Sequence, residues 1–283
     1  MVMTNPVVSH KEPPAESLGG LSVHYINLDR SVERRAVLEN HFSRIGFRAV
    51  RFPAVDGSAI LPKQAESAQH WFWPLITIGR RLTSGEVACA LSHLGLARQL
   101  AATKTDLALI LEDDARIDIE RLRDVVAALD RMPKGWDVLL LNFIHNHFPY
   151  KIGPLGTNHT LFGILGEIDS AAGYLINYSG LQKLSRIEVL EATADRWTWF
   201  AIRQNLRVYG VWPMPITTEQ IGPSVIDTLA ARAKRSHSFY RKVVKTLRRS
   251  LTTAFLRSRA YADCGSRRPA AYASARVTRR TAS

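Results

Sequence analysis

Apolar runs and amphipathic stretches alternate along the chain, which predicts strands followed by helices. Strands that alternate with helices are typical of an α/β domain, and we therefore expect an α/β fold with a mainly parallel sheet. The predicted strands cover residues 21–30, 47–57, 106–114, 136–142, the start of 171–185 and 207–213; the predicted helices cover residues 31–47, 84–103, 117–132, the end of 171–185 and 192–206.

A long connection, residues 53–82, precedes the helix that begins at Ser84, and it contains the aromatic sequence HWFWP. Connections of this length are often lids or acceptor-binding loops. A satellite hydrophobic cluster explains the aromatic residues at least as well. Both interpretations stay open at this point.

Charge divides the chain into a neutral body and a basic tail. Residues 1–230 hold 23 Lys and Arg against 24 Asp and Glu, whereas residues 231–283 hold 15 basic residues and the single acid Asp263. A neutral body speaks against a basic nucleic-acid groove, so we do not expect nucleic acid as a partner. We expect a flexible N-terminus at residues 1–20, a folded domain at 21–228 and a basic tail at 229–283.

The tail carries an apolar stripe with a spacing of four residues, flanked by Lys and Arg. This pattern predicts a basic amphipathic helix, and we expect residues 232–259 to bind an anionic membrane surface, with a disordered end beyond them. The alternative is a helix docked on the protein's own body. The stripe consists of Phe239, Val243, Leu247, Leu251 and Phe255.

Cysteine usage and the N-terminal sequence indicate a cytoplasmic protein. Cys89 and Cys264 lie far apart in unlike contexts, so no disulfide framework is expected. The first residues lack the basic and apolar regions of a signal peptide, and no run is long and apolar enough to cross a bilayer. We expect a cytoplasmic location, peripheral on the inner face of the cytoplasmic membrane.

Three consecutive acids, Glu112, Asp113 and Asp114, directly follow a short apolar run. Ligands of open α/β sheets bind at the carboxyl ends of the strands, and a divalent cation can collect carboxylate oxygens there. The alternative is a solvated turn that opens a helix near Asp118, since acids favour a helix N-terminus.

Arginines stand at the turn between the first predicted strand and its helix, where Asn27 is followed by Arg30 and Arg34. Arginines beside a helix N-terminus suit phosphate, through paired hydrogen bonds and the helix dipole. An ordinary solvated helix face explains the same spacing equally well.

The predicted helix at residues 84–103 places Glu86, Cys89 and His93 on one face, at spacings of three and four. These residue types can bind a transition metal. A cysteine at an apolar helical position is more often a core residue, however, and this stripe lacks the other half of a zinc site. We therefore interpret Cys89 as a core residue.

The order of the motifs is more specific than any one of them. The sequences INLDRSVERR, FPAVDG, LTSGEVACALSH and LALILEDDARID occur in this order, followed by GYLIN and Asp195. This series resembles glycosyltransferase family 25, whose members include bacterial lipooligosaccharide and lipopolysaccharide core glycosyltransferases and collagen galactosyltransferase domains. The resemblance runs from about Val23 to about Asp227 and is strongest at residues 82–118.

The resemblance implies a GT-A-like nucleotide-sugar-binding domain at residues 21–228. It implies inverting transfer of a hexose, galactose or glucose, from a UDP-sugar to a lipid-linked glycan of the lipopolysaccharide or lipooligosaccharide core. Mn²⁺ or Mg²⁺ would be held by Glu112 and Asp114. The implied donor-binding residues are Asn27, Arg30, Arg34, Ser92, His93 and Asp113.

Inverting transfer also requires a carboxylate that takes the proton of the acceptor hydroxyl. Asp195 is our first candidate for this base, with Glu86 and Asp169 behind it. The match to the family thins beyond Trp136, and Asp169 stands where we would expect a small or hydroxyl-bearing residue.

Two other functions are considered beside this one. A metal-dependent phosphoesterase would also use clustered acids and a cation, but the sequence lacks the second cluster of His and Asp that a two-metal site needs. A nucleic-acid-binding protein would act through the basic tail, and the neutral body counts against it.

Overall fold

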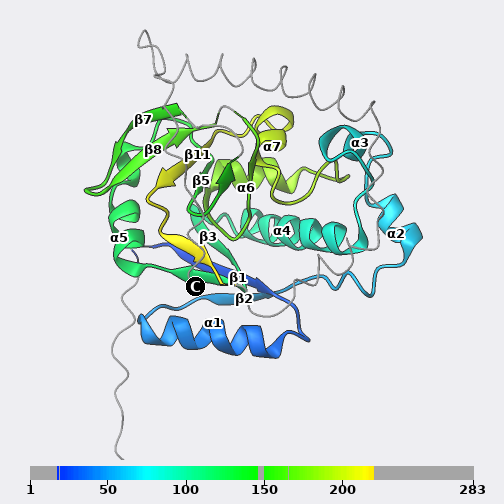
Figure 1. The fold of residues 1–283 in the computed structure, drawn as a ribbon, viewed down its shortest axis with the longest axis horizontal. Coiled ribbons are helices and arrows are strands. Elements are labelled where there is room, and N and C mark those ends of the chain that lie inside the picture. Colours follow the sequence, from blue (N-terminus) through cyan, green and yellow to red (C-terminus); the bar gives the residue numbers. More distant parts are fainter. Residues whose placement is uncertain (1–17, 19, 146–149, 165, 220–283) are drawn as a thin grey trace, which may run out of the picture.

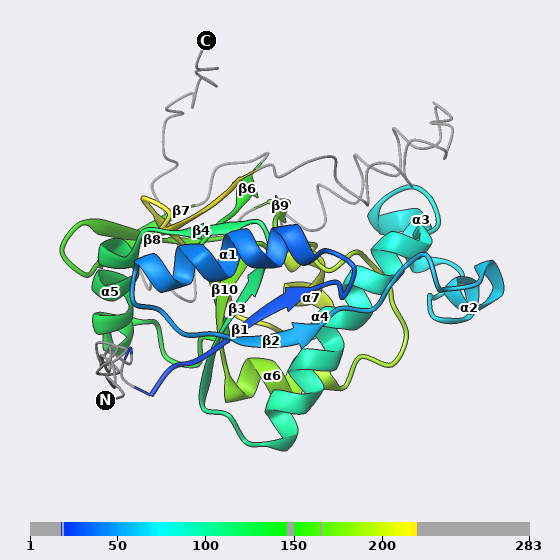
Figure 2. The ribbon, with the colours of Figure 1, turned by 90° about the horizontal axis from the view of Figure 1, so that it is seen from below.

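The computed structural model describes residues 18, 20–145, 150–164 and 166–219. Within these residues an eight-stranded sheet lies between helices on both of its faces, which confirms the predicted α/β class (Figures 1 and 2). Most of the predicted N-terminal segment and the whole tail at 229–283, with the predicted membrane-binding residues 232–259, lie outside the described residues and stay predictions.

The large sheet has the order β2-β1-β3-β10-β5-β11-β8-β7. Two short pairs, β4 with β12 and β6 with β9, lie outside it. The strands are β1 Ser22–Asn27, β2 Val50–Pro53, β3 Leu107–Glu112, β4 Ala115–Ile117, β5 Val138–Leu140, β6 Ile144–His145, β7 Tyr150–Leu155, β8 His159–Gly163, β9 Ile168–Asp169, β10 Gly173–Asn177, β11 Val208–Trp212 and β12 Ile216–Thr218. The helices are α1 Val32–Arg44, α2 Pro62–Ser67, α3 Trp73–Thr77, α4 Ser84–Ala102, α5 Ile119–Ala127, α6 Tyr178–Ser185 and α7 Trp197–Arg203, with a 3₁₀ turn at Leu129–Arg131.

The prediction of a mainly parallel sheet is wrong, because the sheet is mixed. Strands β2, β1 and β3 are parallel, as are β5 and β11, whereas the other four pairings of the large sheet are antiparallel. Strand β10 runs between β3 and β5 in the opposite direction to both. A strand that is buried on both faces reads as a continuous apolar run in either direction, so the hydrophobic pattern could not reveal this reversal.

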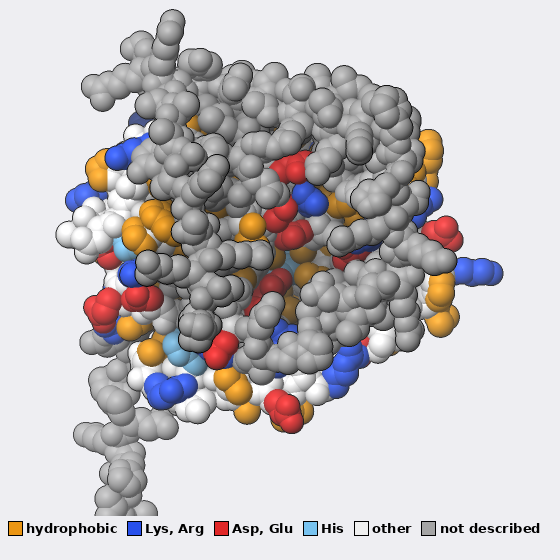
Figure 3. Space-filling model, viewed as in Figure 1, with side chains coloured by type: hydrophobic (Ala, Val, Ile, Leu, Met, Phe, Trp, Pro, Cys, Tyr) orange, Lys and Arg blue, Asp and Glu red, His pale blue; other side chains and the backbone are white. Residues whose placement is uncertain are grey.

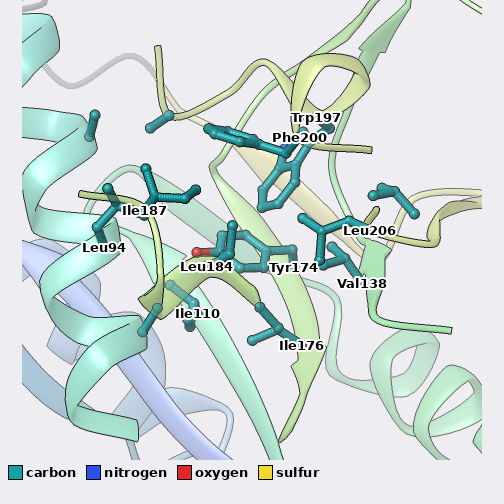
Figure 4. Packing of buried hydrophobic residues seen from close by; sticks show 14 of the residues in the cluster. Leu94, Ile110, Val138, Tyr174, Ile176, Leu184, Ile187, Trp197, Phe200 and Leu206 are labelled. Atoms are coloured by element: carbon teal, nitrogen blue, oxygen red, sulfur yellow. The ribbon is translucent and has the colours of Figure 1, made fainter. Parts of the chain in front are cut away.

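Strand β3 separates two hydrophobic cores, because its successive side chains point to opposite faces of the sheet. Leu109 and Leu111 join the core beneath α1 and α5, whereas Ala108 and Ile110 join the core beneath α4, α6 and α7. All four are fully buried. Figure 4 shows the second core, where Ile110 and Tyr174 from the sheet lie among side chains from these helices. Two packed faces therefore fix the end of β3, where the acidic residues begin.

Capping hydrogen bonds mark where α4 and α5 begin. Helix α4 begins with a capping box, in which the Thr83 hydroxyl accepts from the Glu86 backbone N–H and the Glu86 side chain accepts from the Thr83 backbone N–H. Asp118 caps α5 by accepting a hydrogen bond from the Arg121 backbone N–H at 3.1 Å. Asp118, which lies beyond β4, is therefore the acid at the start of the helix. The alternative that the triplet itself lies in a solvated turn opening this helix is wrong.

The long connection between β2 and α4 forms α2 and α3, and Trp73 of α3 packs against α7. Trp73 lies 5.2 Å from Trp199 between ring centroids, and the Arg203 guanidinium lies over the Trp73 ring at 4.9 Å. Trp71, in contrast, is 68% exposed. Trp73 therefore belongs to a satellite hydrophobic cluster, as one of the two interpretations expected, whereas Trp71 lies on the surface.

Across the part of the chain that the structure describes, none of the helices has the length and apolar character that would let it cross a membrane.

Candidate functional site

One cleft gathers the predicted donor-binding and metal-binding residues. It encloses about 180 Å³ at the carboxyl ends of β1 and β3, between the start of α1, the turn after β2 and one face of α4. The turn after β2 approaches α4 so closely that a Cβ on Gly57 would lie 2.8 Å from the Gly85 Cα. The predicted residues that line the cleft are Asn27, Arg30, Arg34, Ser92, His93, Glu112, Asp113 and Asp114.

The acidic triplet begins at the last residue of β3 and continues into the turn before β4, and one arginine compensates two of its members. The Arg34 guanidinium lies 2.7 Å from Asp113 Oδ1 and 3.6 Å from Asp114 Oδ2. Asn27 Nδ2 donates a hydrogen bond to Asp113 Oδ2 at 2.8 Å. Burial still raises the pKa of Asp113 above its usual value, against the opposing effects of Arg34 and Asn27. Asp113 is therefore engaged within the protein.

Asp114 is the least compensated acid of the triplet. Its Oδ1 is buried and has no hydrogen-bond partner among the described residues. Burial, reinforced by the negative charge of Glu112, raises the pKa of Asp114 to about 6 in spite of Arg34. On the face shown in Figure 3, acidic side chains gather near the middle with basic ones beside them.

Glu112 faces α4. Its Oε1 lies 3.3 Å from His93 Nε2 and 4.0 Å from Cys89 Sγ. The His93 ring is held from its other side, since Nδ1 lies 3.0 Å from the Tyr174 hydroxyl on β10. Burial, followed by the charge of Glu112, raises the pKa of the Cys89 thiol well above its ordinary value. Cys89 packs against the core beneath α4, α6 and α7, as interpreted from the sequence, and it also lines the cleft.

Arg51 on β2 is a site residue that the sequence analysis missed. Its guanidinium donates hydrogen bonds to Asn27 Oδ1 at 3.1 Å, to the Asn27 backbone oxygen at 3.0 Å and to Asp29 Oδ1 at 2.5 Å. These bonds orient the Asn27 amide so that its Nδ2 points at Asp113. Arg51 was hidden in the sequence because only the pairing of β1 with β2 brings it next to Asn27.

Arg30 and Ser92 line the cleft and also form hydrogen bonds within the protein. Arg30 forms an ion pair with Asp56 and donates to Ser58 Oγ at 2.9 Å. The Ser92 hydroxyl accepts from the Val55 backbone N–H at 2.9 Å and donates to the Ala88 carbonyl at 2.7 Å. Ser92 thus fastens the turn after β2 onto α4.

Glu86, although it belongs to α4, has its carboxylate engaged away from the acidic triplet. Arg80 donates to both carboxylate oxygens at 2.7 Å, and Thr83 donates from its backbone N–H at 2.8 Å. Burial alone would raise the pKa of Glu86, but these hydrogen bonds outweigh it and the pKa is lowered. Such a carboxylate is a poor base, and its position supports a capping role.

The other two candidate bases do not line the cleft either. Asp169 on β9 forms an ion pair with Arg196 at 3.1 Å. Asp195 lies just before α7, where its Oδ1 accepts a hydrogen bond from the Thr193 hydroxyl at 2.5 Å. The helix begins after Asp195, at Trp197, with Arg196 as its N-cap residue, so Asp195 does not cap it.

Two acids of the triplet offer oxygen donors that suit a divalent cation. Asp114 brings a buried carboxylate oxygen that lacks a partner among the described residues, and Glu112, two residues earlier, brings a second carboxylate to the same cleft. Oxygen donors of this kind suit Mn²⁺ and Mg²⁺. Asp113 already has its oxygens paired with Arg34 and Asn27.

Known proteins resemble this chain over the same residues. The family model described as glycosyltransferase family 25 (LPS biosynthesis protein) matches residues 21–195. A protein of Aedes aegypti named glycosyltransferase 25 family member is 30% identical over 183 residues, which are 63% of this chain and 30% of that protein. Procollagen galactosyltransferase 1 of Danio rerio is 26% identical over 185 residues, 62% of this chain and 30% of that protein.

The chain therefore covers about a third of the length of these relatives. Among solved structures, a glycosyltransferase involved in the glycosylation of the major capsid of PBCV-1 superimposes with a TM-score of 0.28 at 8% identity, over 65% of this chain and 66% of that one. So low a score carries no argument. The family match covers well over half of the sequence and contains every residue that lines the cleft. This chain belongs to glycosyltransferase family 25.

Proposed function

We propose that this chain is the catalytic domain of an inverting, metal-dependent hexosyltransferase with a GT-A-like fold, which uses a UDP-sugar as donor. The observation that carries the proposal is the convergence of the acidic triplet, Arg30 and Arg34 in one cleft at the carboxyl ends of β1 and β3. A nucleoside diphosphate carries the charge that such a mixture of arginines and cation-binding acids can hold.

The arginines prepare the cleft for a diphosphate. Arg34 pairs with Asp113 and Asp114, and Arg30 pairs with Asp56, so both guanidinium groups are held in place before any ligand arrives. A guanidinium can donate several hydrogen bonds at once, which lets each arginine keep its carboxylate partner and also donate to a phosphate oxygen. Glu112 and Asp114 would hold Mn²⁺ or Mg²⁺, which when bound would stabilise the charge on the departing diphosphate.

The names of the relatives favour galactose as the transferred sugar, with glucose as the second choice. The family description favours a lipid-linked core saccharide of the lipopolysaccharide type as acceptor. The name of the Danio rerio relative suggests a procollagen acceptor for that protein, so a procollagen acceptor should be compared with the saccharide acceptor in the same assay. A phosphoesterase is less well supported, because the described residues hold one convergent group of three potential metal ligands and not two.

Asp195 remains our first candidate for the base. The Glu86 carboxylate is occupied by Arg80 and Thr83, and Asp169 is paired with Arg196. Asp195, in contrast, accepts a hydrogen bond from a neutral hydroxyl, that of Thr193. Its charge also contributes to the raised pKa of Cys89, which places it within electrostatic reach of the cleft.

The cation assignment is tested by Glu112→Ala and Asp114→Ala. Each variant should fold normally and lose transfer by a factor on the order of 10³ or more, since a cation contributes several kcal/mol to stabilising the leaving group. The measurement is UDP release from UDP-galactose and UDP-glucose with Mn²⁺, with and without acceptor. Glu120→Ala, which removes an exposed acid on α5, is the matched control. Near-normal rates at saturating donor, with unchanged Mn²⁺ dependence, would contradict the assignment.

The base assignment is tested by Asp195→Asn beside Glu86→Gln. Asp195→Asn should leave UDP binding intact and lower the rate of transfer by about 10² to 10⁴, the range for loss of a general base. Glu86→Gln should lower thermal stability, because it weakens the Arg80 pair and the cap of α4, while most of the rate is kept. Normal transfer by Asp195→Asn together with a large rate loss in Glu86→Gln would reverse the two roles.

The tail, which lies outside the described residues, is proposed to bring the domain to an anionic inner membrane surface through residues 232–259. Its excess of Lys and Arg and its apolar stripe support this. The intact chain should sediment with anionic vesicles at low salt and less at high salt, and a chain shortened after residue 228 should not. An intact chain that ignores such vesicles at low salt would rule the membrane role out.

A further inference from the structure

Helix α4 and strand β3 together complete a group of metal-ligating side chains at the edge of the cleft. Among the described residues, Cys89, His93 and Glu112 each present a ligand atom within 4.8 Å of the other two. Cys89 and His93 lie one helical turn apart on α4, and Glu112 reaches them from the end of β3. Glu112 therefore takes the place of Glu86 as the third potential ligand beside Cys89 and His93, since the Glu86 carboxylate is bound to Arg80.

The distances within the group are close to those of a filled tetrahedral site. His93 Nε2 lies 3.3 Å from Glu112 Oε1, and Cys89 Sγ lies 4.0 Å from the same oxygen. In zinc sites, metal–ligand bonds of about 2.0 Å to nitrogen or oxygen and about 2.3 Å to sulfur put a nitrogen and an oxygen ligand about 3.3 Å apart and a sulfur ligand about 3.5 Å from either. Small side-chain adjustments would bring the three atoms onto one ion.

The surroundings of His93 also suit a metal ligand. Its side chain is 7% exposed, and its Nδ1 lies 3.0 Å from the Tyr174 hydroxyl. A hydroxyl can accept a hydrogen bond from Nδ1–H, and that tautomer leaves the Nε2 lone pair directed at Glu112. A partner of this kind on the second ring nitrogen is the usual support of a metal-bound histidine.

We propose that Cys89, His93 and Glu112 bind a borderline-soft transition-metal ion of the Zn²⁺ class, with the fourth coordination position open to the cleft. On binding, a metal–sulfur bond forms and the thiol proton passes to solvent. The three protein ligands and an open position match the composition of zinc sites that bind an exchangeable fourth ligand. Metal binding at this site can be tested without the proposed transfer reaction, because the ion is recognised by the ligand set alone.

This site differs in chemistry from the proposed Mn²⁺ or Mg²⁺ position. Thiolate and imidazole ligands select Zn²⁺, Co²⁺ and their neighbours, whereas Asp114 adds a hard carboxylate oxygen. Glu112 belongs to both sets, so an ion on Cys89 and His93 would compete for this carboxylate. Bound Zn²⁺ would therefore weaken the binding of Mn²⁺ or Mg²⁺ at the neighbouring position.

Cobalt is the probe, because a Co²⁺ ion bound to a thiolate absorbs in the near ultraviolet and a tetrahedral Co²⁺ ion absorbs strongly in the visible. The full-length reduced chain should bind one equivalent of Co²⁺ with both bands, and Zn²⁺ but not Mg²⁺ should bleach them. Cys89→Ala should abolish the near-ultraviolet band and weaken Co²⁺ binding by about 100-fold or more. Cys264→Ala, which removes the other cysteine of the chain, should keep both bands.

Glu112→Gln serves as a second variant, and far-ultraviolet circular dichroism verifies that each variant is folded. A folded Glu112→Gln chain should keep a weak thiolate band and bind Co²⁺ at least tenfold less tightly. Absence of both bands in the wild-type chain at millimolar Co²⁺ overturns the proposal. So does a band that survives Cys89→Ala and disappears in Cys264→Ala, since the ion would then sit on the tail. None of these readouts depends on glycosyl transfer, so a failed transfer assay would leave this result standing.

Discussion

The site depends on one electrostatic constraint: three successive carboxylates stand at the end of a strand that is buried on both faces. Strand β3 is packed into two hydrophobic cores, so its carboxyl end cannot move outward to hydrate the acids that follow. Burying an ionised carboxylate is costly unless an opposite charge or hydrogen bonds compensate it. The residues around the triplet are arranged to supply that compensation.

Each acid is compensated in a different way. Asp113 receives Arg34 and Asn27, and Asn27 is in turn oriented by Arg51. Glu112 lies against His93 and Cys89 from α4. Asp114 shares Arg34 at a longer distance and keeps one oxygen without a hydrogen bond among the described residues. The compensation is therefore incomplete, and the proposed cation would supply the missing positive charge.

The sequence predicted the parts of the site that follow directly from local patterns. The apolar run before the acids predicts a buried strand, and Arg30 and Arg34 are predicted at the turn that follows the first strand. What it could not predict depends on pairing. The antiparallel insertion of β10 brings Tyr174 to His93, the pairing of β2 with β1 brings Arg51 to Asn27, and β3 brings Glu112 to Cys89. The apolar helix position of Cys89 predicts core packing, and only the fold shows that Glu112, from a strand distant in the sequence, lies 4.0 Å from its Sγ.

The pH dependence of unfolding tests the incomplete compensation most directly. The pKa of Asp114 is raised from 3.8 to about 6 in the folded chain, so the folded state holds this proton more tightly than the unfolded chain does. The free energy of unfolding should therefore fall as pH rises from about 4 through about 6, by up to about 3 kcal/mol from this group.

We would measure it by denaturant unfolding with a metal chelator present, for the wild-type chain, Asp114→Asn and the exposed-site control Asp130→Asn. The account predicts that Asp114→Asn removes this fall and is more stable than the wild-type chain above pH 7, whereas Asp130→Asn follows the wild-type profile. An Asp114→Asn profile with the same fall as the wild-type chain would contradict it.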